Sequence, residues 1–350
     1  MTAKRVTSQD VADQVGVSRT TVSFVLNKVP GSQISDDTRR RVIQAAEELG
    51  YVPDAAARAL ASRRARIIGL VLARGHHHLA SDAFITQILD GLIDVVRQNG
   101  MRLLTDIVEP QHQEGTYLDL VRAKRIDGII LSGPRFDDEA LQALEGDGFP
   151  TVLMGQLPNT SLYSVDVDNY AAARIAVAHL INLGHTRIAS ITNASTTYTA
   201  AAERLRGYTE ELEAAGLHFH EELVRYGDFD PQSGYEQMKS LLEMEPQPSA
   251  VFVASDVVAF GAMAAIREHG LAIPNDIALV GFDDVPFAKY FDPPLTTMRL
   301  PATELAREAS KLIINLLKNE QPEQRHVILS TNLVIRESCG YSTRRVIREA

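Results

Sequence analysis

The sequence is poor in cysteine and has no long apolar run. Its 350 residues include one cysteine, Cys339, and no apolar stretch approaches the ~20 residues that a membrane-spanning helix needs. One cysteine excludes an internal disulfide framework and fits a reducing compartment. The N-terminal segment MTAKRVTSQD lacks the apolar core of a secretory signal. We therefore expect a cytoplasmic protein without a membrane partner.

The sequence also lacks a recognisable catalytic or metal-binding constellation. No Ser/His/Asp arrangement or phosphate loop stands out, and nothing around Cys339 would activate it as a nucleophile. The run His76–His78 has adjacent histidines, whereas zinc ligands are spaced, and no second cysteine could join them. We interpret this run as a solvated loop near the mouth of a ligand cleft, with ligand contact left open. We expect no catalytic residues, cofactor or resident metal.

Negative charge dominates the whole chain but not its N-terminal part. The net charge of −10, taken alone, argues against a nucleic-acid partner. Residues 1–66 carry 11 Lys and Arg against 7 Asp and Glu, whereas the other 284 residues carry 24 against 38. A small basic head on a large acidic body is typical of a DNA-binding module joined to another domain. Chance fluctuation of surface charge is the alternative interpretation.

The basic head contains the signals of three short helices. Capping residues are expected to begin them: Thr7 with Asp10 as a capping box, Ser18, and Ser35 or Asp36. Gly16 is expected to end the first helix and Gly50 the third. The predicted core positions of the first and third helices are Val11, Ala12, Val15, Val42, Ile43, Ala46 and Leu49.

The second expected helix lies within GVSRTTVSFVLN and has two different faces. At 100° per residue the apolar residues share one side: Val22, Val25 and Leu26. The rest of the surface carries groups able to contact bases and phosphates: Arg19, Thr20, Ser23, Phe24 and Asn27. A solvated face is the alternative, but the capped preceding helix, the glycine turn and the basic balance favour a helix-turn-helix that binds DNA.

The rest of the chain alternates between apolar strands and helices that end on glycine. The candidate strands cover residues 67–72, 101–108, 126–133, 186–192, 249–255 and 277–282. Near-continuous apolar strands separated by helices indicate parallel sheets covered on both faces. Because the pattern occurs twice, over about 66–165 and 166–295, we predict two doubly wound lobes.

The longer motifs are specific enough to compare with a known family. They are VTSQDVADQVGVSRTTVSFVLN, TRRRVIQAAEELGYVPDAAARALASRR, VDVDNYAAARIAVAHLINLGH, RLRGY, YGDFDPQSGY, FVASDVVAFGAM, IALVGFDD and PPLTTMRLP. In this order, over essentially the whole chain, they resemble the lac-repressor-type (LacI/GalR) family of bacterial transcription regulators. The resemblance implies an all-α helix-turn-helix head, a hinge helix, and an α/β core of two parallel-sheet lobes like periplasmic sugar-binding proteins. It also implies a homodimer on pseudo-palindromic operator DNA, associated with the nucleoid when bound, whose affinity a small effector controls.

The resemblance implies a division into five parts. They are residues 1–50 as the DNA-binding domain, 51–66 as hinge helix and linker, 67–165 with about 297–325 as the N-terminal lobe, 166–296 with about 326–341 as the C-terminal lobe, and 342–350 as a tail. A plain linker is the alternative to the hinge helix, because 54–62 is too short to hold a helix alone. The tail has no leucine heptads, so a dimer is expected rather than a tetramer.

The resemblance also implies which residues contact DNA. The base-reading positions are Arg19, Thr20 and Phe24, phosphate-contacting positions are Ser23 and Asn27, and Thr7, Ser18 and Thr21 join them at the helix starts. Many relatives carry a basic residue where this chain has Phe24, so we expect an apolar contact, such as a thymine methyl, in its place. In the hinge the expected contacts are Ala57, Arg58 and Leu60, with Leu60 as the wedge that opens a base step from the minor groove.

The effector is expected between the lobes, at the carboxyl ends of the strands. The matching pocket positions are Phe84, Asp168, Asn169, Arg204, Phe229, Asp256 and Asp283. Carboxylates and a guanidinium can hydrogen-bond vicinal hydroxyls while the phenyl rings cover a sugar ring. Each acid alone could instead be a cap or loop residue, and Asp256 could cap the helix that follows it. Residues 192–203 lack the additional arginine of purine-binding relatives, which favours a neutral sugar.

Two classes of function are consistent with such a core. The first is a DNA-binding regulator, most simply a repressor, controlled by a carbohydrate effector. The second is a solute-binding protein or a sugar-processing enzyme built on the same two lobes. The basic capped head and the absence of a secretory signal count against transport, and the missing catalytic constellation counts against an enzyme.

Overall fold

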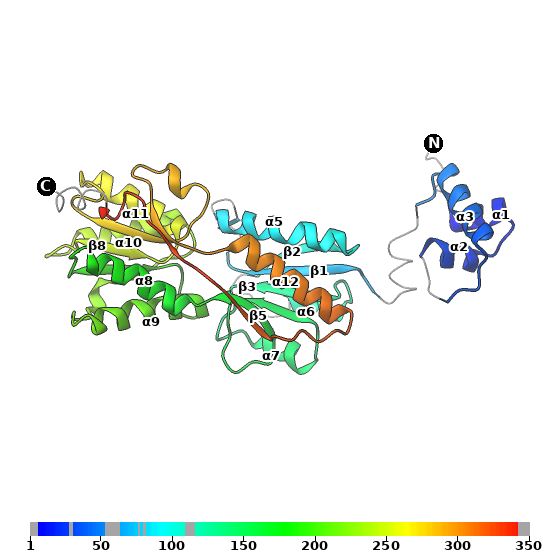
Figure 1. Ribbon diagram of the computed structural model, residues 1–350, viewed down its shortest axis with the longest axis horizontal. Helices are drawn as coiled ribbons and strands as arrows, with labels where there is room; N and C mark the ends of the chain where they lie inside the picture. The colour runs from blue at the N-terminus through cyan, green and yellow to red at the C-terminus, as the bar shows by residue number, and fades with distance from the viewer. Residues whose placement is uncertain are drawn as a thin grey trace. The chain divides into compact units, whose positions relative to one another are not determined.

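The computed structural model describes residues 6–27, 31–52, 64–75, 78–79, 82–108 and 116–341. The chain forms two compact units, Met1–Arg66 and Ile67–Ala350, and each is described by itself. Figure 1 labels their helices and strands. None of the helices in the described ranges is long and apolar enough to cross a membrane.

The described part of the head unit contains α1 (Ser8–Val15), α2 (Arg19–Leu26) and α3 (Asp36–Glu48). The predicted capping box is present, since the backbone N of Thr7 donates to Asp10 Oδ2 at 2.7 Å and the backbone N of Asp10 donates to Thr7 Oγ1 at 3.4 Å. Gly16 ends α1 with a φ of 72°, a conformation that favours glycine. Ser18 and Ser35 cap α2 and α3, so the predicted helix starts are confirmed.

Apolar side chains from all three helices form one small core. Its buried members are Val11, Ala12, Val15, Val22, Val25, Val42, Ala45 and Ala46. One predicted core position is wrong, because Ile43 is 41% exposed and Ala45 is buried instead. Positions 42, 45, 46 and 49 share one helix face at spacings of three and four, and residue 43 lies 100° away from residue 42.

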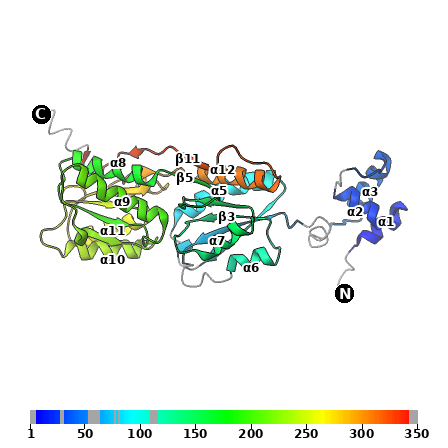
Figure 2. The ribbon, with the colours of Figure 1, turned by 90° about the horizontal axis from the view of Figure 1, so that it is seen from below.

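The described residues of the core unit form two six-stranded sheets. The first has the order β11-β5-β4-β3-β1-β2, all parallel, from β1 (Ile67–Ala73), β2 (Arg102–Val108), β3 (Gly128–Ser132), β4 (Thr151–Met154), β5 (Tyr163–Val167) and β11 (His326–Leu329). Two helices lie side by side on one face, α5 (Ala83–Gln98) and α12 (Ala302–Leu317). The other face carries α6 (Thr116–Arg122) and α7 (Glu139–Gly146), as Figure 2 shows. We call this assembly the first lobe.

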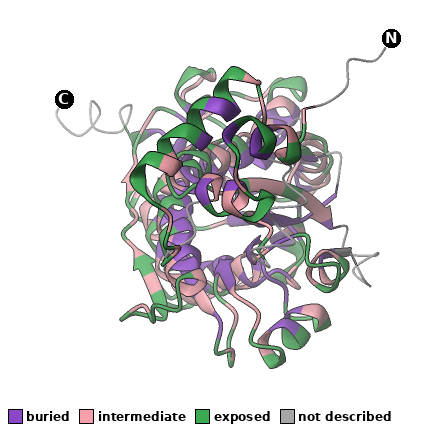
Figure 3. Cartoon of the chain, turned by 90° about the vertical axis from the view of Figure 1, so that its right-hand side faces the viewer, coloured by how far each residue is buried: buried purple, intermediate pink, exposed green. Residues whose placement is uncertain are grey.

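The second lobe repeats this arrangement. Its sheet has the order β12-β10-β9-β8-β6-β7, from β6 (Ile188–Thr192), β7 (Val224–Tyr226), β8 (Ala250–Val253), β9 (Ala278–Asp283), β10 (Thr296–Arg299) and the antiparallel β12 (Leu333–Val334). One face carries α8 (Asn169–Asn182) and α9 (Thr199–Ala214), and the other carries α10 (Pro231–Leu242) and α11 (Asp256–Glu268). Because these helices pack one side against a sheet and leave the other side exposed, buried and exposed residues alternate along them (Figure 3). The predicted fold class, a helical head and two parallel-sheet lobes, is confirmed.

Within the described residues the chain crosses between the sheets after β5, after β10 and after β11. The boundaries predicted near 165, 297 and 326 are each a few residues too early. The assignment of residues from about 326 to the C-terminal lobe is wrong for β11, because this strand pairs in parallel with β5 of the first sheet. Strands this short, at the edges of their lobes, carry too little hydrophobic pattern to be found from sequence.

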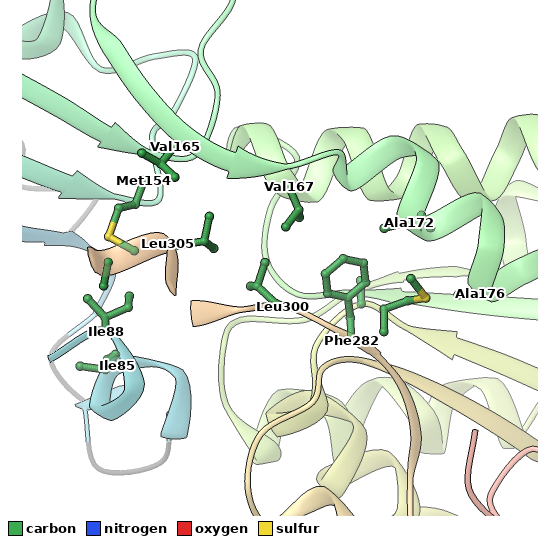
Figure 4. Packing of buried hydrophobic residues seen from close by; sticks show 14 of the residues in the cluster. Ile85, Ile88, Met154, Val165, Val167, Ala172, Ala176, Phe282, Leu300 and Leu305 are labelled. Carbon is green, nitrogen blue, oxygen red and sulfur yellow. The ribbon is translucent and has the colours of Figure 1, made fainter. Parts of the chain in front are cut away.

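Hydrophobic packing continues from one lobe to the other through these crossings. In Figure 4, Val167 and Leu300 lie between Met154 and Leu305 of the first lobe and Phe282 of the second. All of these residues belong to one buried cluster. The crossings therefore hold the strand ends of both sheets near one another.

Candidate functional site

The exposed face of α2 carries the residues predicted to contact DNA. Arg19 and Thr20 are exposed, and the side chain of Phe24 is 40% exposed although it is apolar. Val22 and Val25 are buried in the head core on the opposite side. One helix thus supplies both a core face and a face that is open to a partner.

Hydrogen bonds fix the orientation of several side chains on this face. Arg19 Nε donates to Ser8 Oγ at 3.3 Å, and Asn27 Nδ2 donates to Ser23 Oγ at 3.1 Å. The remaining predicted contacts on described residues make capping interactions: Thr7, Ser18 and Thr21. Helix starts leave backbone N–H groups unpaired, which suits phosphate contact. The predicted hinge contacts Ala57, Arg58 and Leu60 lie outside the described residues.

A cavity lies at the carboxyl ends of strands from both sheets of the core; with the solvent-open space at its mouth it spans about 690 Å³. Its walls include residues just beyond strand ends: Arg74 after β1, Gly133 after β3, Gly155 after β4, Asn193 after β6 and Ser255 two residues after β8. Of the predicted pocket residues, four line it: Phe84, Arg204, Phe229 and Asp283.

Arg204 is the central cation of the second lobe's wall. It is 5% exposed, its Nη1 lies 3.7 Å from Asp283 Oδ1, and it donates from Nη1 to the carbonyl oxygen of Ala254 at 2.7 Å. Its Nε donates to Asn169 Oδ1 at 2.8 Å. Its Cζ lies 3.6 Å from the centroid of the Phe282 ring. The guanidinium is therefore held in one orientation before any ligand arrives, which reduces the entropy cost of binding.

The acidic groups near Arg204 are protonated more readily than exposed acids. Burial raises the pKa of Asp283 to about 7, with Arg204 opposing the rise and Asp82 adding to it. Burial also raises the pKa of Asp166 to about 6. The pKa of Asp256 is raised well above its usual range by burial and by the charge of Asp283. A carboxyl group that exchanges its proton near neutral pH can both donate to and accept from hydroxyl groups.

Because of this raised pKa, Asp283 should make the stability of the core depend on pH. Between the ordinary pKa of 3.8 and the folded value of about 7, the folded protein holds a proton that the unfolded chain has released. The free energy of unfolding therefore falls as pH rises through that window. We expect Asp283→Asn to gain thermal stability relative to the wild type between pH 4.5 and pH 7.5. Calorimetry at several pH values measures this, and a difference that does not change with pH contradicts it.

Aromatic rings also line the cavity. Phe229 makes a T-shaped contact with Tyr198, with centroids 5.1 Å apart, and the Cζ of Arg74 lies 4.6 Å from the Phe229 centroid. Phe84 stands near the same guanidinium, with its centroid 5.9 Å from Arg74 Cζ. Polar groups and aromatic rings in one cavity are the features that a sugar, with its polar edges and apolar ring faces, would use.

Three predicted pocket residues do not line this cavity. Asp168 caps α8, accepting from the backbone N of Ala171 at 2.8 Å, and borders a separate hollow. Asn169 also borders that hollow. Its Oδ1 accepts a hydrogen bond from Arg204 Nε, which orients the guanidinium. Asp256 is fully buried and accepts from Thr297 Oγ1 at 2.6 Å and from the backbone N of Val285 at 2.9 Å. It is therefore neither a helix cap nor a cavity-lining group in this structure.

The structure adds lining residues that sequence reasoning missed. They include Arg74, Asp82, Asp166, Asn193, Tyr198 and Ser255. Arg74 forms an ion pair with Asp82, which also caps α5. A usable signal existed, since Arg74 and Asn193 each follow an apolar strand directly. Polar residues at strand ends in parallel sheets are good candidates for ligand contact.

The structure also corrects the interpretation of the histidine run. His76 and His77 lie outside the described residues, but His78 is only 1% exposed and does not belong to a solvated loop. Its Nδ1 accepts from the backbone N of Gly75 at 3.1 Å, and its Nε2 lies 3.6 Å from Asp228 Oδ2. The ring also meets Phe229 edge-on at 5.8 Å. His78 therefore links the first lobe to the second beside the cavity.

The chain matches two known families. Residues 7–54 match the bacterial regulatory proteins of the lacI family, and residues 177–339 match the periplasmic binding protein-like domain. The HTH-type transcriptional regulator CelR of Thermobifida fusca is 37% identical over 341 residues, which cover 96% of this chain and 98% of CelR. The HTH-type transcriptional repressor CytR of Escherichia coli (strain K12) is 32% identical over 334 residues, with 95% and 96% covered.

Solved structures of regulators are similar to this chain over almost its whole length. A transcriptional regulator CelR–cellobiose complex has a TM-score of 0.72 at 34% identity and covers 95% of this chain and 100% of that one. A lac repressor dimer bound to operator and the anti-inducer ONPF has a TM-score of 0.83 at 30% identity, with 96% and 99% covered. With relatives above 30% identity along almost its whole length, the chain belongs to the lacI family of bacterial regulatory proteins.

Proposed function

We propose that the protein is a sequence-specific transcriptional repressor whose affinity for operator DNA is controlled by a carbohydrate bound in the core cavity. The observation that carries this proposal is the cavity itself, which buried acids and Arg204 line together with the rings of Phe84 and Phe229. The cavity belongs to a chain whose head presents a polar helix face. A relative solved with cellobiose supports a carbohydrate ligand.

We also propose that the protein forms a homodimer and acts inside the cell. A lac repressor dimer bound to operator supports two heads on a pseudo-palindromic site. The protein would act in the bacterial cytoplasm, associated with the nucleoid while bound. The relatives named above are regulators rather than enzymes, which favours this function over a solute-binding protein or a sugar-processing enzyme. The free energy that couples effector binding to DNA binding is about 1–3 kcal/mol in typical allosteric proteins.

A gel-shift experiment with the DNA upstream of the protein's own gene tests the proposal. We expect a specific complex at physiological salt whose affinity changes when the correct saccharide is added. A competitor of unrelated sequence at equal length controls for charge-driven binding, which is strongly salt-dependent. Absence of any specific complex, with or without saccharides, contradicts the proposed function.

Leu60→Ala tests the proposed hinge contact. An apolar wedge in the minor groove bends the operator and gains contacts that non-specific DNA does not offer. We expect operator affinity to fall about tenfold or more, while affinity for unrelated DNA stays nearly constant. Ser62→Ala in the same segment is the matched control and should change neither. Equal losses on both kinds of DNA contradict the wedge role.

A further inference from the structure

Two strands hold corresponding positions in the two sheets of the core. β1 and β6 are each the fifth strand in the sheet order, next to the edge strands β2 and β7. The chain leaves β1 through Arg74 and leaves β6 through Asn193. Both side chains line the same cavity. Each lobe therefore places one polar group at the same point of its fold, and both groups reach one ligand site.

Arg74 is buried, oriented and incompletely hydrogen-bonded. It is 3% exposed, and its Nη1 donates to Asp82, while its guanidinium lies against the rings of Phe229 and Phe84. Its Nε is buried and has no hydrogen-bond partner among the described residues. A buried donor without a partner lowers stability, so its persistence in a ligand cavity indicates a function in binding.

Asn193 has the complementary property. It is 5% exposed, and its Oδ1 is buried without a hydrogen-bond partner in the described part of the chain. Its backbone carbonyl accepts from the N of Phe229 at 2.8 Å, which holds the residue beside the cavity. The first lobe thus offers an open donor, and the second lobe an open acceptor.

We propose that Arg74 Nε and Asn193 Oδ1 bind the effector from the two lobes, and that their ligand is a neutral polyhydroxylated molecule. A hydroxyl oxygen accepts from Arg74, and a hydroxyl hydrogen is donated to Asn193. A phosphate or carboxylate group only accepts, so it would leave the Asn193 oxygen unsatisfied. Asp82 offsets the charge of Arg74, and Asp283 with Asp166 offsets that of Arg204, so the walls carry no excess positive charge to attract an anion. This inference rests on the proposed function and assigns it two residues and a ligand class.

The first test compares two buried asparagines without any ligand. Asn169 makes its hydrogen bonds to Asp166 and Arg204 within the protein, whereas Asn193 Oδ1 makes none among described residues. We expect Asn169→Ala to lower the Tm by several degrees, and Asn193→Ala to leave it within about 1 °C of the wild type or raise it. An Asn193→Ala protein as unstable as Asn169→Ala overturns the inference, because Asn193 would then be structural.

The second test measures binding on the full-length protein. The probes are cellobiose, maltose, lactose, glucose and galactose, with glucose 6-phosphate as the anionic comparison. For the neutral saccharide that binds the wild type, Asn193→Ala and Arg74→Lys should each weaken binding about tenfold or more. Lysine keeps a positive charge for Asp82 but removes the Nε donor, so the ion pair is controlled for.

Three outcomes overturn the inference. They are unchanged affinity in both variants, tighter binding of glucose 6-phosphate than of every neutral probe, and no binding by any neutral probe. Operator binding by the wild-type protein is measured separately and without saccharide. A wild-type protein that forms no specific operator complex contradicts the proposed function instead, so the two failures are distinguishable.

Discussion

Operator binding by an Asp283→Ala variant will no longer respond to the effector, although the variant still forms the operator complex. The substitution removes a carboxyl group from the cavity wall and takes away the acid that lies 3.7 Å from the buried Arg204. Loss of a hydrogen bond between the ligand and a group that can be charged usually costs about 1.5–3 kcal/mol, or roughly tenfold or more in affinity. Isothermal titration with the saccharide, together with gel shifts, measures both effects.

A matched control separates this loss from a general effect of removing an acid. Asp276 is an exposed carboxylate of the same lobe that accepts from the backbone N of Ala272 and does not line the cavity. Asp276→Ala should bind and respond as the wild type does. If Asp283→Ala binds the effector with unchanged affinity, the assignment of this cavity as the effector site is wrong.

Gly261→Ala will lower the stability of the core by about 3 kcal/mol or more. Gly261 of α11 faces α10 so closely that a Cβ would overlap the carbonyl oxygen of Pro231, and the reciprocal Gly234 meets Val258 in the same way. Both obstacles are backbone atoms, so the helices must separate, and forced overpacking usually costs 1–3 kcal/mol or more. A change of this size lowers the Tm by about 6 °C or more. Thermal unfolding followed by circular dichroism measures it.

Gly146→Ala is the control, and it should change the stability in the opposite direction. Gly146 ends α7, and a Cβ there would meet nothing within 4 Å. Alanine in a helix with free space should stabilise by about 0.5–1 kcal/mol, because glycine loses more backbone entropy on folding. A similar Tm for the two variants would show that the contact between α10 and α11 is looser than described.

The parts of the fold that sequence predicted well are those with strong local signals. Thr7, Ser18 and Gly16 have side chains or backbone freedom that only a helix end uses, so they located α1 and α2. β4, β5 and β11 were missed because four or five residues do not establish a pattern. The exposure of Ile43 was missed because one apolar residue beside a stripe looks like part of it. Only packing against α1 and α2 separates the two cases.

The site was predicted in part for a similar reason. Arg204 and Asp283 were found through the motifs RLRGY and GFDD, and both line the cavity. Asp256 lies in an equally good motif, but its carboxylate turns toward Thr297 and Val285, which only three-dimensional contacts reveal. Arg74 was overlooked because its partner Asp82, its two rings and Asn193 come from separate segments. Its position directly after β1 was a local signal, but its contacts with these groups appear only in three dimensions.

The crossings between the lobes also set the order in which the nascent chain can complete its parts. The head core is closed by residues before 52, so it can form early in synthesis. The first lobe lacks α12 and β11 until about residue 329 has been made, since these elements pack on α5 and β5. The apolar surface of the incomplete first lobe therefore stays exposed while the second lobe is translated. A product truncated before about residue 329 would contain a complete head unit and an incomplete core unit.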